Sequence, residues 1–289
     1  MRFTQEQLEE LTDSLSDIEI GQQFECRHGT VRYYRVKYGI KSYTEKTSNC
    51  KSTSEGKVRR RGTTDFSDEN PDNLIVDYFQ NIDTPDKAYW VGLLAADGCI
   101  TDDWRVQIGL NIEDKHIIDL LASCLGVPEL VKERIVNHEG LLGKSKSTHS
   151  CVLRVSSKQM CLDLERQGLV PRKTRVIQIS PCAFDYPTHY LRGYLDGNGS
   201  ICEKNFAFTS GSEKLIDQIR ELIYENFGTW LYKRTQTSKD TGGICHTLWG
   251  YRKDSEILQW LYKDIHLTSC FLERKRMKFS RFWCNPYTD

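Results

Sequence analysis

Four side chains of this sequence combine the types and the spacing of a metal-assisted site: Asp97, Asn198, Lys173 and Lys275. Asp97 and Asn198 lie 101 residues apart, and each directly precedes a glycine. Lys173 follows Asp97 by 76 residues, and Lys275 follows Asn198 by 77 residues. These nearly equal offsets predict that the two pairs occupy equivalent positions in a duplicated structure.

The glycine after Asp97 or Asn198 ends a stretch that occurs twice, at residues 89–100 and 190–201. Each copy reads as a helix that stops at its glycine, Gly98 or Gly199. A small residue recurs every fourth position, which lets two helix backbones approach closely; these residues are Gly92, Ala96, Gly193 and Gly197. We therefore predict that the two helices pack on each other.

The acidic residue at the end of the first helix needs compensation. A carboxylate in the last turn lies against the negative end of the helix dipole, which costs a few tenths to ~1 kcal/mol unless a cation is near. A bound divalent metal ion at Asp97 would supply that charge.

The two stretches, with their glycine spacing and terminal polar residue, resemble the signature of the LAGLIDADG homing endonuclease family, over residues from about 80 to the end. The resemblance implies an α+β fold. Two αββαββα halves would pack through the motif helices, with saddle-shaped antiparallel sheets on the DNA side. It also implies hydrolysis of phosphodiester bonds in double-stranded DNA with Mg²⁺ or Mn²⁺ at the helix ends.

The resemblance assigns roles to the residues at the helix ends. The candidate metal ligands are Asp97, Gly98, Asn198 and Gly199. Lys173 and Lys275 would polarise water or stabilise developing charge, or else make nonspecific phosphate contacts. Asp196 lies two residues before the helix end, so we expect it to point away from the metal.

Asn198 departs from the family pattern, which has an acidic residue there. Its amide oxygen can still bind a metal, but one negative charge is lost, so we expect weaker metal binding. Three interpretations remain open: an asymmetric enzyme that favours nicking one strand, a decayed DNA-binding protein, or an engineered Asp-to-Asn change.

Alternating residues predict the DNA-facing surface of the first half. Residues 105–112 alternate polar and apolar types, so Val106, Ile108, Leu110 and Ile112 would face the helices. The open face would then carry Arg105, Gln107 and Asn111, continued by Lys132, Arg134 and Arg154. In the second half the corresponding residues would be Tyr232, Arg234 and Gln236, with the phase of the strand near Tyr251 and Arg252 left open. Arginine and glutamine read base edges in the major groove, although an ordinary solvated sheet face is the alternative.

Composition sets outer bounds on the class of protein. The 289 residues carry no net charge and no apolar run long enough to span a membrane. The N-terminus has no signal-peptide core, so we expect a soluble intracellular protein, cytoplasmic or nucleoid-associated. The eleven scattered cysteines, without a Cys-x-x-Cys pair, predict reduced packing residues.

The charge is segregated along the chain. Residues 26–61 hold eleven Arg or Lys and two acids, between acidic stretches at 4–25 and 65–86. Residues 1–40 resemble a helix-turn-helix domain, with a capping box from Thr4 to Gln7 and a third helix ending at Gly39. We expect Val31 and Tyr34 to face inward, and Arg32, Arg35 and either Arg27 or His28 to face outward. The candidate DNA contacts are Arg27, His28, Thr30, Arg32 and Arg35, and a small helical bundle with a basic surface is the alternative.

The predicted domains are the helix-turn-helix at 1–40, a basic linker at 41–73, and halves at 74–182 and 183–289. Within the linker, Arg59, Arg60 and Arg61 would contact phosphate or the minor groove, or form a solvated charge run. Because one chain supplies both halves, we expect a monomer.

Two functional classes follow. The leading one is a site-specific homing endonuclease, free-standing or encoded in an intron or intein, whose activity Asn198 reduces or biases to one strand. The other is a non-cleaving sequence-specific DNA-binding regulator on the same scaffold. An RNA-splicing maturase is a weaker third.

Overall fold

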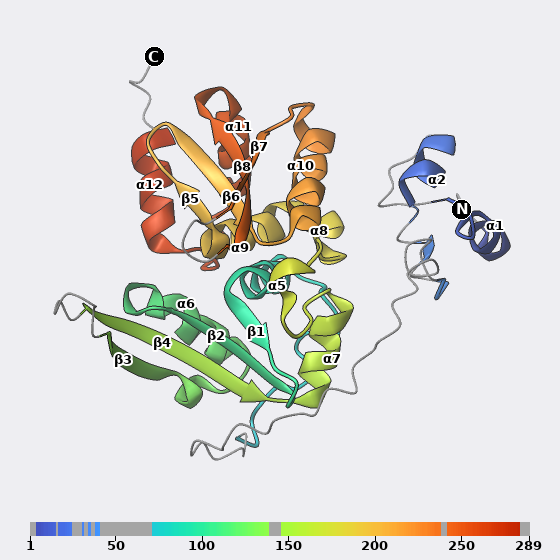
Figure 1. Ribbon diagram of the computed structural model, residues 1–289. Coiled ribbons are helices and arrows are strands. Elements are labelled where there is room, and N and C mark those ends of the chain that lie inside the picture. The colour runs from blue at the N-terminus through green and yellow to red at the C-terminus, as the bar shows by residue number, and fades with distance from the viewer. Residues whose placement is uncertain are drawn as a thin grey trace. The chain divides into compact units, whose positions relative to one another are not determined.

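The computed structural model describes residues 4–15, 17–24, 31, 34, 35, 38–40, 71–138, 146–237 and 242–283. The chain divides into two compact units, Met1–Phe66 and Ser67–Asp289, and each is described by itself (Figure 1).

The N-terminal unit contains α1 (Gln5–Leu11) and α2 (Asp17–Gln23). The predicted capping box is confirmed, since the Thr4 side chain accepts from the Gln7 backbone and the Gln7 side chain accepts from the Thr4 backbone. Val31, Tyr34 and Arg35 are helical, and Gly39 has a φ of +69°. The small core consists of Leu8, Ile20, Val31 and Ile40 with partly buried neighbours that include Tyr34, so the predicted inward positions of Val31 and Tyr34 are confirmed.

Arg35 contradicts the predicted outward position. Its side chain is buried at 7% exposure, and its Nε donates to Asp17 Oδ1 at 3.0 Å. Its Nη1 also donates to the Ile40 carbonyl oxygen at 2.9 Å. Arg35 thus ties the third helical segment to α2 and is no exposed DNA contact. The other contacts proposed for this unit and the linker (Arg27, His28, Thr30, Arg32, Arg59, Arg60 and Arg61) lie outside the described residues.

The second unit repeats one αββαββα plan, as the sequence predicts. The first half runs α5 (Pro85–Asp97), β1 (Gly98–Ile100), β2 (Arg105–Asn111), α6 (Lys115–Cys124), β3 (Lys132–His138), β4 (Lys146–Ser156) and α7 (Lys158–Arg166). After α8 (Cys182–Asp185), the second half runs α9 (Pro187–Asn198), β5 (Gly199–Ile201), β6 (Asn205–Ser210), α10 (Glu213–Phe227), β7 (Tyr232–Thr237), β8 (Ile244–Tyr251) and α11 (Ser255–Tyr262), followed by α12 (Glu273–Trp283).

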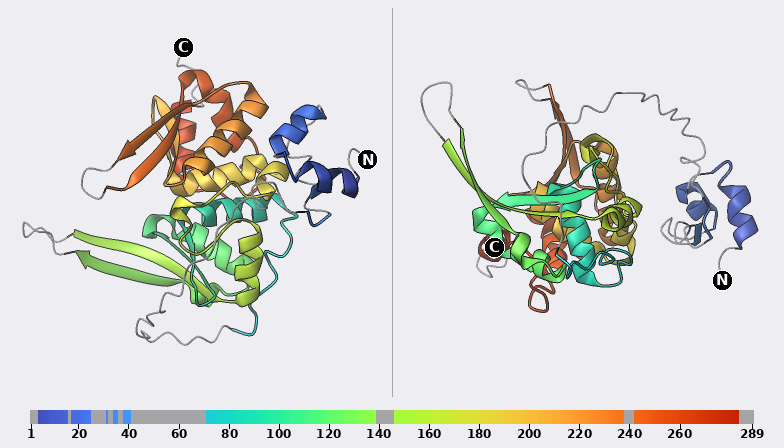
Figure 2. Two further views of the ribbon diagram at one scale, coloured as in Figure 1. Left: turned by 45° about the vertical axis from the view of Figure 1, so that its right-hand side comes forward. Right: turned by 90° about the horizontal axis from the view of Figure 1, so that it is seen from below.

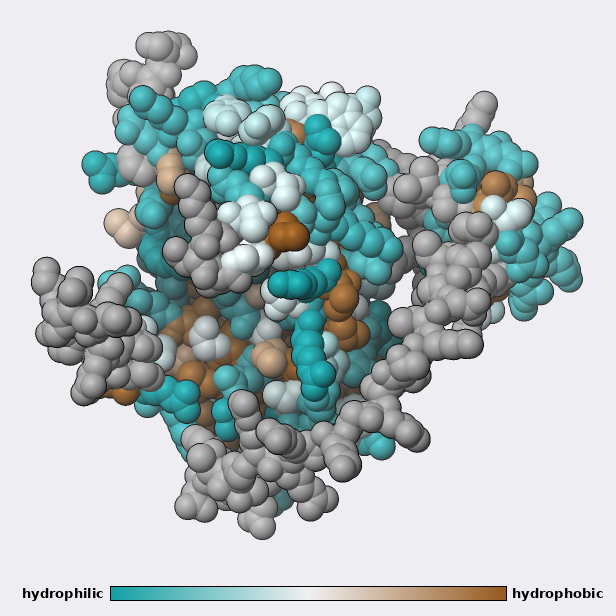
Figure 3. All heavy atoms as spheres, viewed as in Figure 1, coloured by the Kyte–Doolittle hydropathy of each residue, from teal (hydrophilic) through white to brown (hydrophobic). Residues whose placement is uncertain are grey.

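Both sheets are antiparallel and four-stranded, with orders β1-β2-β4-β3 and β5-β6-β8-β7. Each short first strand leaves its motif helix directly, with Gly98 opposite Ile108 and Gly199 opposite Phe208. The β3–β4 and β7–β8 hairpins project on the same side of the unit (Figure 2). Hydrophilic residues cover much of the face shown in Figure 3.

The motif helices α5 and α9 lie side by side at the centre (Figure 2), and glycine sets their distance. A Cβ atom added to Gly92 would collide with the Tyr190 carbonyl oxygen and lie 3.0 Å from the Tyr194 nitrogen. A Cβ atom on Gly193 would collide with the Tyr89 carbonyl oxygen. The predicted close packing is therefore confirmed, and it is contact between backbones.

Candidate functional site

The ends of the two motif helices meet where the sequence places its site. Asp97 ends α5 and Asn198 ends α9, and both side chains are partly buried. A Cβ atom added to Gly197 would lie 3.0 Å from Asp97 Oδ2, so the carboxylate rests against the neighbouring helix. The Asn198 amide in turn donates from Nδ2 to the Ala96 carbonyl oxygen at 3.3 Å.

The two lysines each reach one helix end. Lys173, in the 3₁₀ helix η3 (Lys173–Arg175), donates from Nζ to the Ala96 carbonyl oxygen at 3.3 Å. Lys275 of α12 donates to the carbonyl oxygens of Leu195 at 2.5 Å, Asp196 at 2.6 Å and Gly199 at 2.9 Å. Each ammonium group therefore satisfies carbonyls that the last turn leaves unpaired and opposes the negative end of the dipole. Each lysine thus reaches the end of its own motif helix, but the two lie on different elements and bond carbonyls that do not correspond in the repeat.

Burial is the largest influence on the pKa values of Asp97, Lys173 and Lys275. It raises the pKa of the Asp97 carboxyl, although Lys275 and Lys173 act to lower it. Burial also lowers the pKa of Lys173, and it lowers that of Lys275 to about 8, with Asp196 and Asp97 acting in the opposite direction. One carboxylate and two ammonium groups thus share a poorly solvated region.

The ligand atoms available at the helix ends limit how a metal ion would be held. No group of three or more His, Cys, Asp and Glu side chains suited to a metal occurs among the described residues. Asp97 offers a carboxylate and Asn198 an amide oxygen, whereas the Gly199 carbonyl already accepts from Lys275. Such a set fits Mg²⁺, which keeps waters and takes phosphate oxygens as ligands, better than a metal that needs a closed cage of side chains.

Asp196 has a different role, as expected from its place in the motif. Its side chain is fully buried and accepts from Tyr89 Oη at 2.9 Å, Tyr262 Oη at 3.0 Å and the Leu272 nitrogen at 2.8 Å. The Tyr89 bond crosses from α5 to α9, so Asp196 joins the two halves. Burial raises its pKa, and Lys275 opposes this effect.

A second buried polar contact was not predicted. Arg192 of α9 is fully buried, and its guanidinium donates to the Cys270 carbonyl at 3.1 Å, the Leu261 carbonyl at 2.9 Å and Asp264 Oδ1 at 2.6 Å. His189 Nε2 lies 2.6 Å from the other Asp264 oxygen. Arg192 occupies a place in the motif where the first half has Val91, a difference that could have signalled it.

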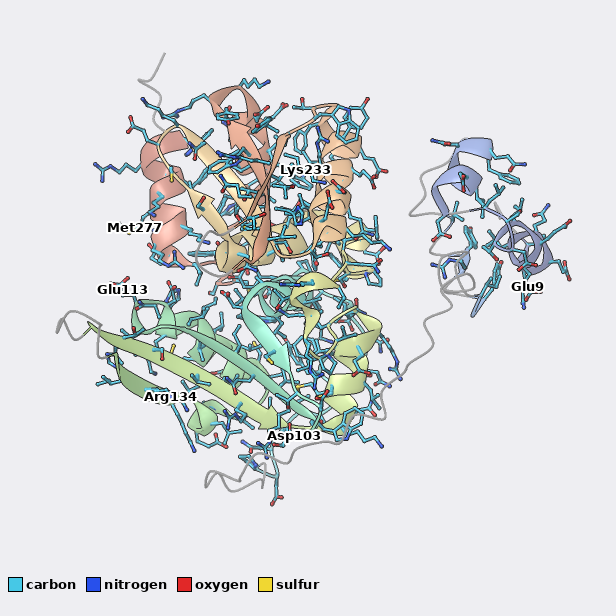
Figure 4. The ribbon with its side chains drawn as sticks, viewed as in Figure 1. Glu9, Asp103, Glu113, Arg134, Lys233 and Met277 are labelled. Atoms are coloured by element: carbon cyan, nitrogen blue, oxygen red, sulfur yellow. The ribbon has the colours of Figure 1, made fainter. Side chains whose placement is uncertain are left out.

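The open face of the first sheet carries the predicted polar residues. Val106, Ile108 and Leu110 are buried, while Asn111 is exposed and Arg105 and Gln107 are partly exposed. Gln107 and Arg154 are paired across β2 and β4, and Arg154 donates to Gln107 Oε1 at 2.7 Å. Lys132 and Arg134 extend this face on β3 and are exposed; Arg134 is labelled in Figure 4.

The second sheet settles the strand phase that the sequence left open. Tyr232 pairs with Trp249, Arg234 with Thr247 and Gln236 with Cys245, all on the open face. Tyr251 shares that face, because it lies two residues beyond Trp249 on β8. Lys233 points the other way and donates to Asp217 Oδ1 at 2.6 Å (Figure 4). Trp249 and Cys245 are partly exposed residues of this face that strand alternation would have found once the phase was known, whereas Thr247 is buried.

The fold and the paired helix ends define a two-half protein with an internal pseudo-twofold arrangement. A family model described as a LAGLIDADG-like domain matches residues 185–257. The resemblance drawn from the motifs is thereby confirmed for the second half, and the first half repeats its topology.

Several solved structures are similar to the chain. The homing endonuclease I-WcaI bound to its DNA recognition sequence has 13% identity and a TM-score of 0.47, covering 70% of this chain and 90% of that one. Mesophilic variants of the homing endonuclease I-DmoI have 16% identity and a TM-score of 0.40, covering 62% and 96%. Full-length DUF199/WhiA from Thermatoga maritima has 12% identity and a TM-score of 0.40, covering 74% and 66%. No curated protein matches the chain.

Across the described part of the chain, none of the helices has the length and apolar character needed to cross a membrane.

Proposed function

We propose that this protein is a site-specific DNA endonuclease that binds a long duplex target across its two open sheet faces. The observation that carries the proposal is the convergence of Asp97, Asn198, Lys173 and Lys275 on the ends of two helices in backbone contact. A site on such a shared axis addresses both strands of a duplex. The open faces carry Arg, Lys and Gln side chains suited to phosphates and base edges.

The residues of the site divide the work. Asp97 and Asn198 would hold Mg²⁺ or Mn²⁺, which when bound activates water and stabilises charge on the leaving oxygen. Lys173 and Lys275 hold the helix ends in place through the carbonyls of Ala96, Leu195, Asp196 and Gly199. Their positive charge near Asp97 also favours the approach of a phosphate.

A non-cleaving DNA-binding regulator is the second candidate, and one contact favours it. Asn198 donates to the Ala96 carbonyl, so its amide has a partner without any metal ion. An aspartate at this place would instead bring a carboxylate against a carbonyl oxygen and would need a cation. The asparagine thus suits a site with reduced metal binding or none.

Two substitutions test these candidates on supercoiled DNA carrying the target with Mg²⁺, with nicked and linear products resolved. We expect Asp97→Asn to abolish cutting, because it removes the carboxylate that holds a dication. We expect Asn198→Asp to raise double-strand cleavage, because it gives each helix end a carboxylate and so restores the negative charge. The gain in transition-state stabilisation is on the order of a few kcal/mol. Both variants should bind DNA normally. If Asn198→Asp binds DNA normally but cuts it no better than the parent protein, the result favours the non-cleaving regulator over the endonuclease.

We also propose that residues 1–62 form an accessory DNA-binding region with a helix-turn-helix and a basic linker. Deleting them should weaken binding and shorten the footprint without moving the cut, because phosphate contacts and chemistry belong to different units. A shifted cut at saturating protein would show that this region helps to build the active site.

The protein should sediment as a monomer near the chain mass of 33.6 kDa, and a stable dimer would contradict the arrangement of two halves in one chain.

A further inference from the structure

The open faces of the two sheets have opposite chemistry. On the first sheet, strand register places Arg105, Arg154, Lys132 and Arg134 on one face. Lys132 and Arg134 are exposed, and Arg105 and Arg154 are partly exposed. No Phe, Tyr or Trp residue lies on this face among the described positions of β1 to β4. The first face is therefore cationic.

The second sheet presents aromatic and neutral side chains instead. Tyr232 and Trp249 are cross-strand partners, and Tyr251 follows on the same face of β8. Tyr232 is 57% exposed and Tyr251 is 42% exposed. Arg234 is the one charged residue on this face within the described strands β5 to β8. The equivalent surfaces of a duplicated fold have thus diverged.

The polar groups of the second face are mostly amides and hydroxyls. Asn205 and Thr209 share the face with the aromatic residues and are partly exposed, and Thr247 shares it but is buried. Turning the Gln236 amide places its oxygen 2.8 Å from Arg234 Nη2, the orientation in which acceptor meets donor. Gln236 then engages Arg234, the one charged residue of this face within the described strands.

These two sets match different base pairs in the major groove. Guanine offers the O6 and N7 acceptors that suit Arg and Lys, whereas adenine offers an acceptor and a donor that suit Asn and Gln. Thymine adds a C5-methyl group, which takes apolar contact from threonine methyls and aromatic rings. We propose that the two halves recognise half-sites of opposite composition, G·C pairs under the first sheet and A·T pairs with thymine methyls under the second. The inference rests on the proposed function, binding of duplex DNA.

Aromatic residues on an open sheet also stack unpaired bases, as single-stranded RNA or DNA binders do. Such surfaces join their aromatic residues to a cationic groove that follows the backbone. Within its described strands, the second face has Arg234 alone for that purpose, and the neighbouring Lys233 is held on the other side by Asp217 and Glu213. Duplex recognition through methyl groups fits this low charge better.

The test begins with selection of bound sequences from a random duplex library by the full-length protein. We expect one side of the enriched site to be rich in G·C pairs and the other in A·T pairs. Replacing thymine by deoxyuridine removes only the methyl group, so each contacted position in the A·T half should lose about fourfold in affinity, as for one buried methyl group. The same replacement in the G·C half should have little effect.

Matched variants assign each half-site to its sheet. Trp249→Leu should remove the deoxyuridine effect in the A·T half while leaving the response to 7-deazaguanine in the G·C half. Arg134→Ala should do the reverse, with a loss of about 5- to 150-fold at the guanine it contacts, the range for a bidentate pair. These comparisons within one variant do not depend on its overall stability.

The outcomes distinguish failure of the divided readout from failure of the proposed binding of duplex DNA. If no duplex sequence is enriched, the proposed function itself fails. If a site is enriched but both halves have even composition or respond equally to deoxyuridine, the divided readout is wrong and duplex binding stands. Tighter binding of single-stranded RNA than of any duplex, weakened by Trp249→Leu, would also overturn the inference.

Discussion

Lys275 donates from its ammonium group to the carbonyl oxygen of Gly199 at 2.9 Å, which links α12 to the residue where the second motif helix ends. The lysine is 2% exposed and also holds the carbonyls of Leu195 and Asp196. Lys173 makes one such bond, to Ala96, at 3.3 Å.

The two lysines should therefore differ in their effect on stability. Lys275→Met removes three carbonyl partners, each of which leaves a buried acceptor unsatisfied at a cost of about 1 to 3 kcal/mol. Lys173→Met removes one partner and should cost less. Urea unfolding of both variants measures the difference, and equal losses would contradict a structural role that is specific to Lys275.

Glycine at the helix crossing should be irreplaceable. Gly92→Ala places a methyl group against the Tyr190 carbonyl, so the backbones must separate at a cost of about 3 kcal/mol. Gly109→Ala is the matched control, because its added Cβ atom would meet only the Val152 side chain at 3.3 Å and the Cys151 carbonyl at 3.6 Å. Thermal unfolding should show a large fall in Tm for the first variant and a small change for the second. A tolerated Gly92→Ala would show that the helices can part freely.

The Asp264 carboxylate should stabilise the second half in a pH-dependent way. Arg192 and His189 hold its pKa below the ordinary value against the opposing effect of burial. Because the folded-state pKa is depressed, the stabilisation is present above the unfolded-state pKa and is lost as pH falls through the folded-state value.

Asp264→Asn should lower the free energy of unfolding at neutral pH by about 3 kcal/mol, since it leaves the buried Arg192 charge without its carboxylate. The gap between parent and variant should shrink as the solution is acidified below pH ~4. Urea titrations at several pH values measure this difference in the free energy of unfolding. A difference that stays constant down to pH 2 would exclude the Asp264 carboxylate as the source of the pH dependence.

Arg35 should matter for folding of the N-terminal unit. Arg35→Ala and Asp17→Ala break the same ion pair, in which the two side chains are 8% and 16% exposed. The double variant should lose little more than either single variant. Hydrogen exchange of residues 4–24 in the full chain reports the loss, and additive effects would mean that the pair is not the shared cause.

The duplication made most of the fold predictable. Residues 89–100 and 190–201 share their small-residue spacing, so the helix pair, its glycine contacts and the repeated order of strands all follow from sequence. The alternation from Arg105 to Asn111 likewise indicated which face of β2 is buried.

Contacts between distant segments could not be read in this way. Helical periodicity places Arg35 on an outer face, but Asp17, 18 residues earlier, draws it inward. Arg192 and Asp264 are separated by 72 residues, and no local pattern connects them. The phase of β8 required its pairing with β7, because both faces of residues 244–251 carry apolar and polar types.

The hydrogen bond from Tyr89 to Asp196 also bears on how the duplication diverged. The first half has Ala95 where the second has Asp196, so a homodimer of first halves would leave each Tyr89 hydroxyl without this carboxylate. A homodimer of second halves would instead place Tyr190, the counterpart of Tyr89 in the repeated stretch, opposite each Asp196. If an ancestor assembled from identical subunits, its two copies have become unlike partners, and a first half separated from the chain should pair with a second half in preference to its own copy.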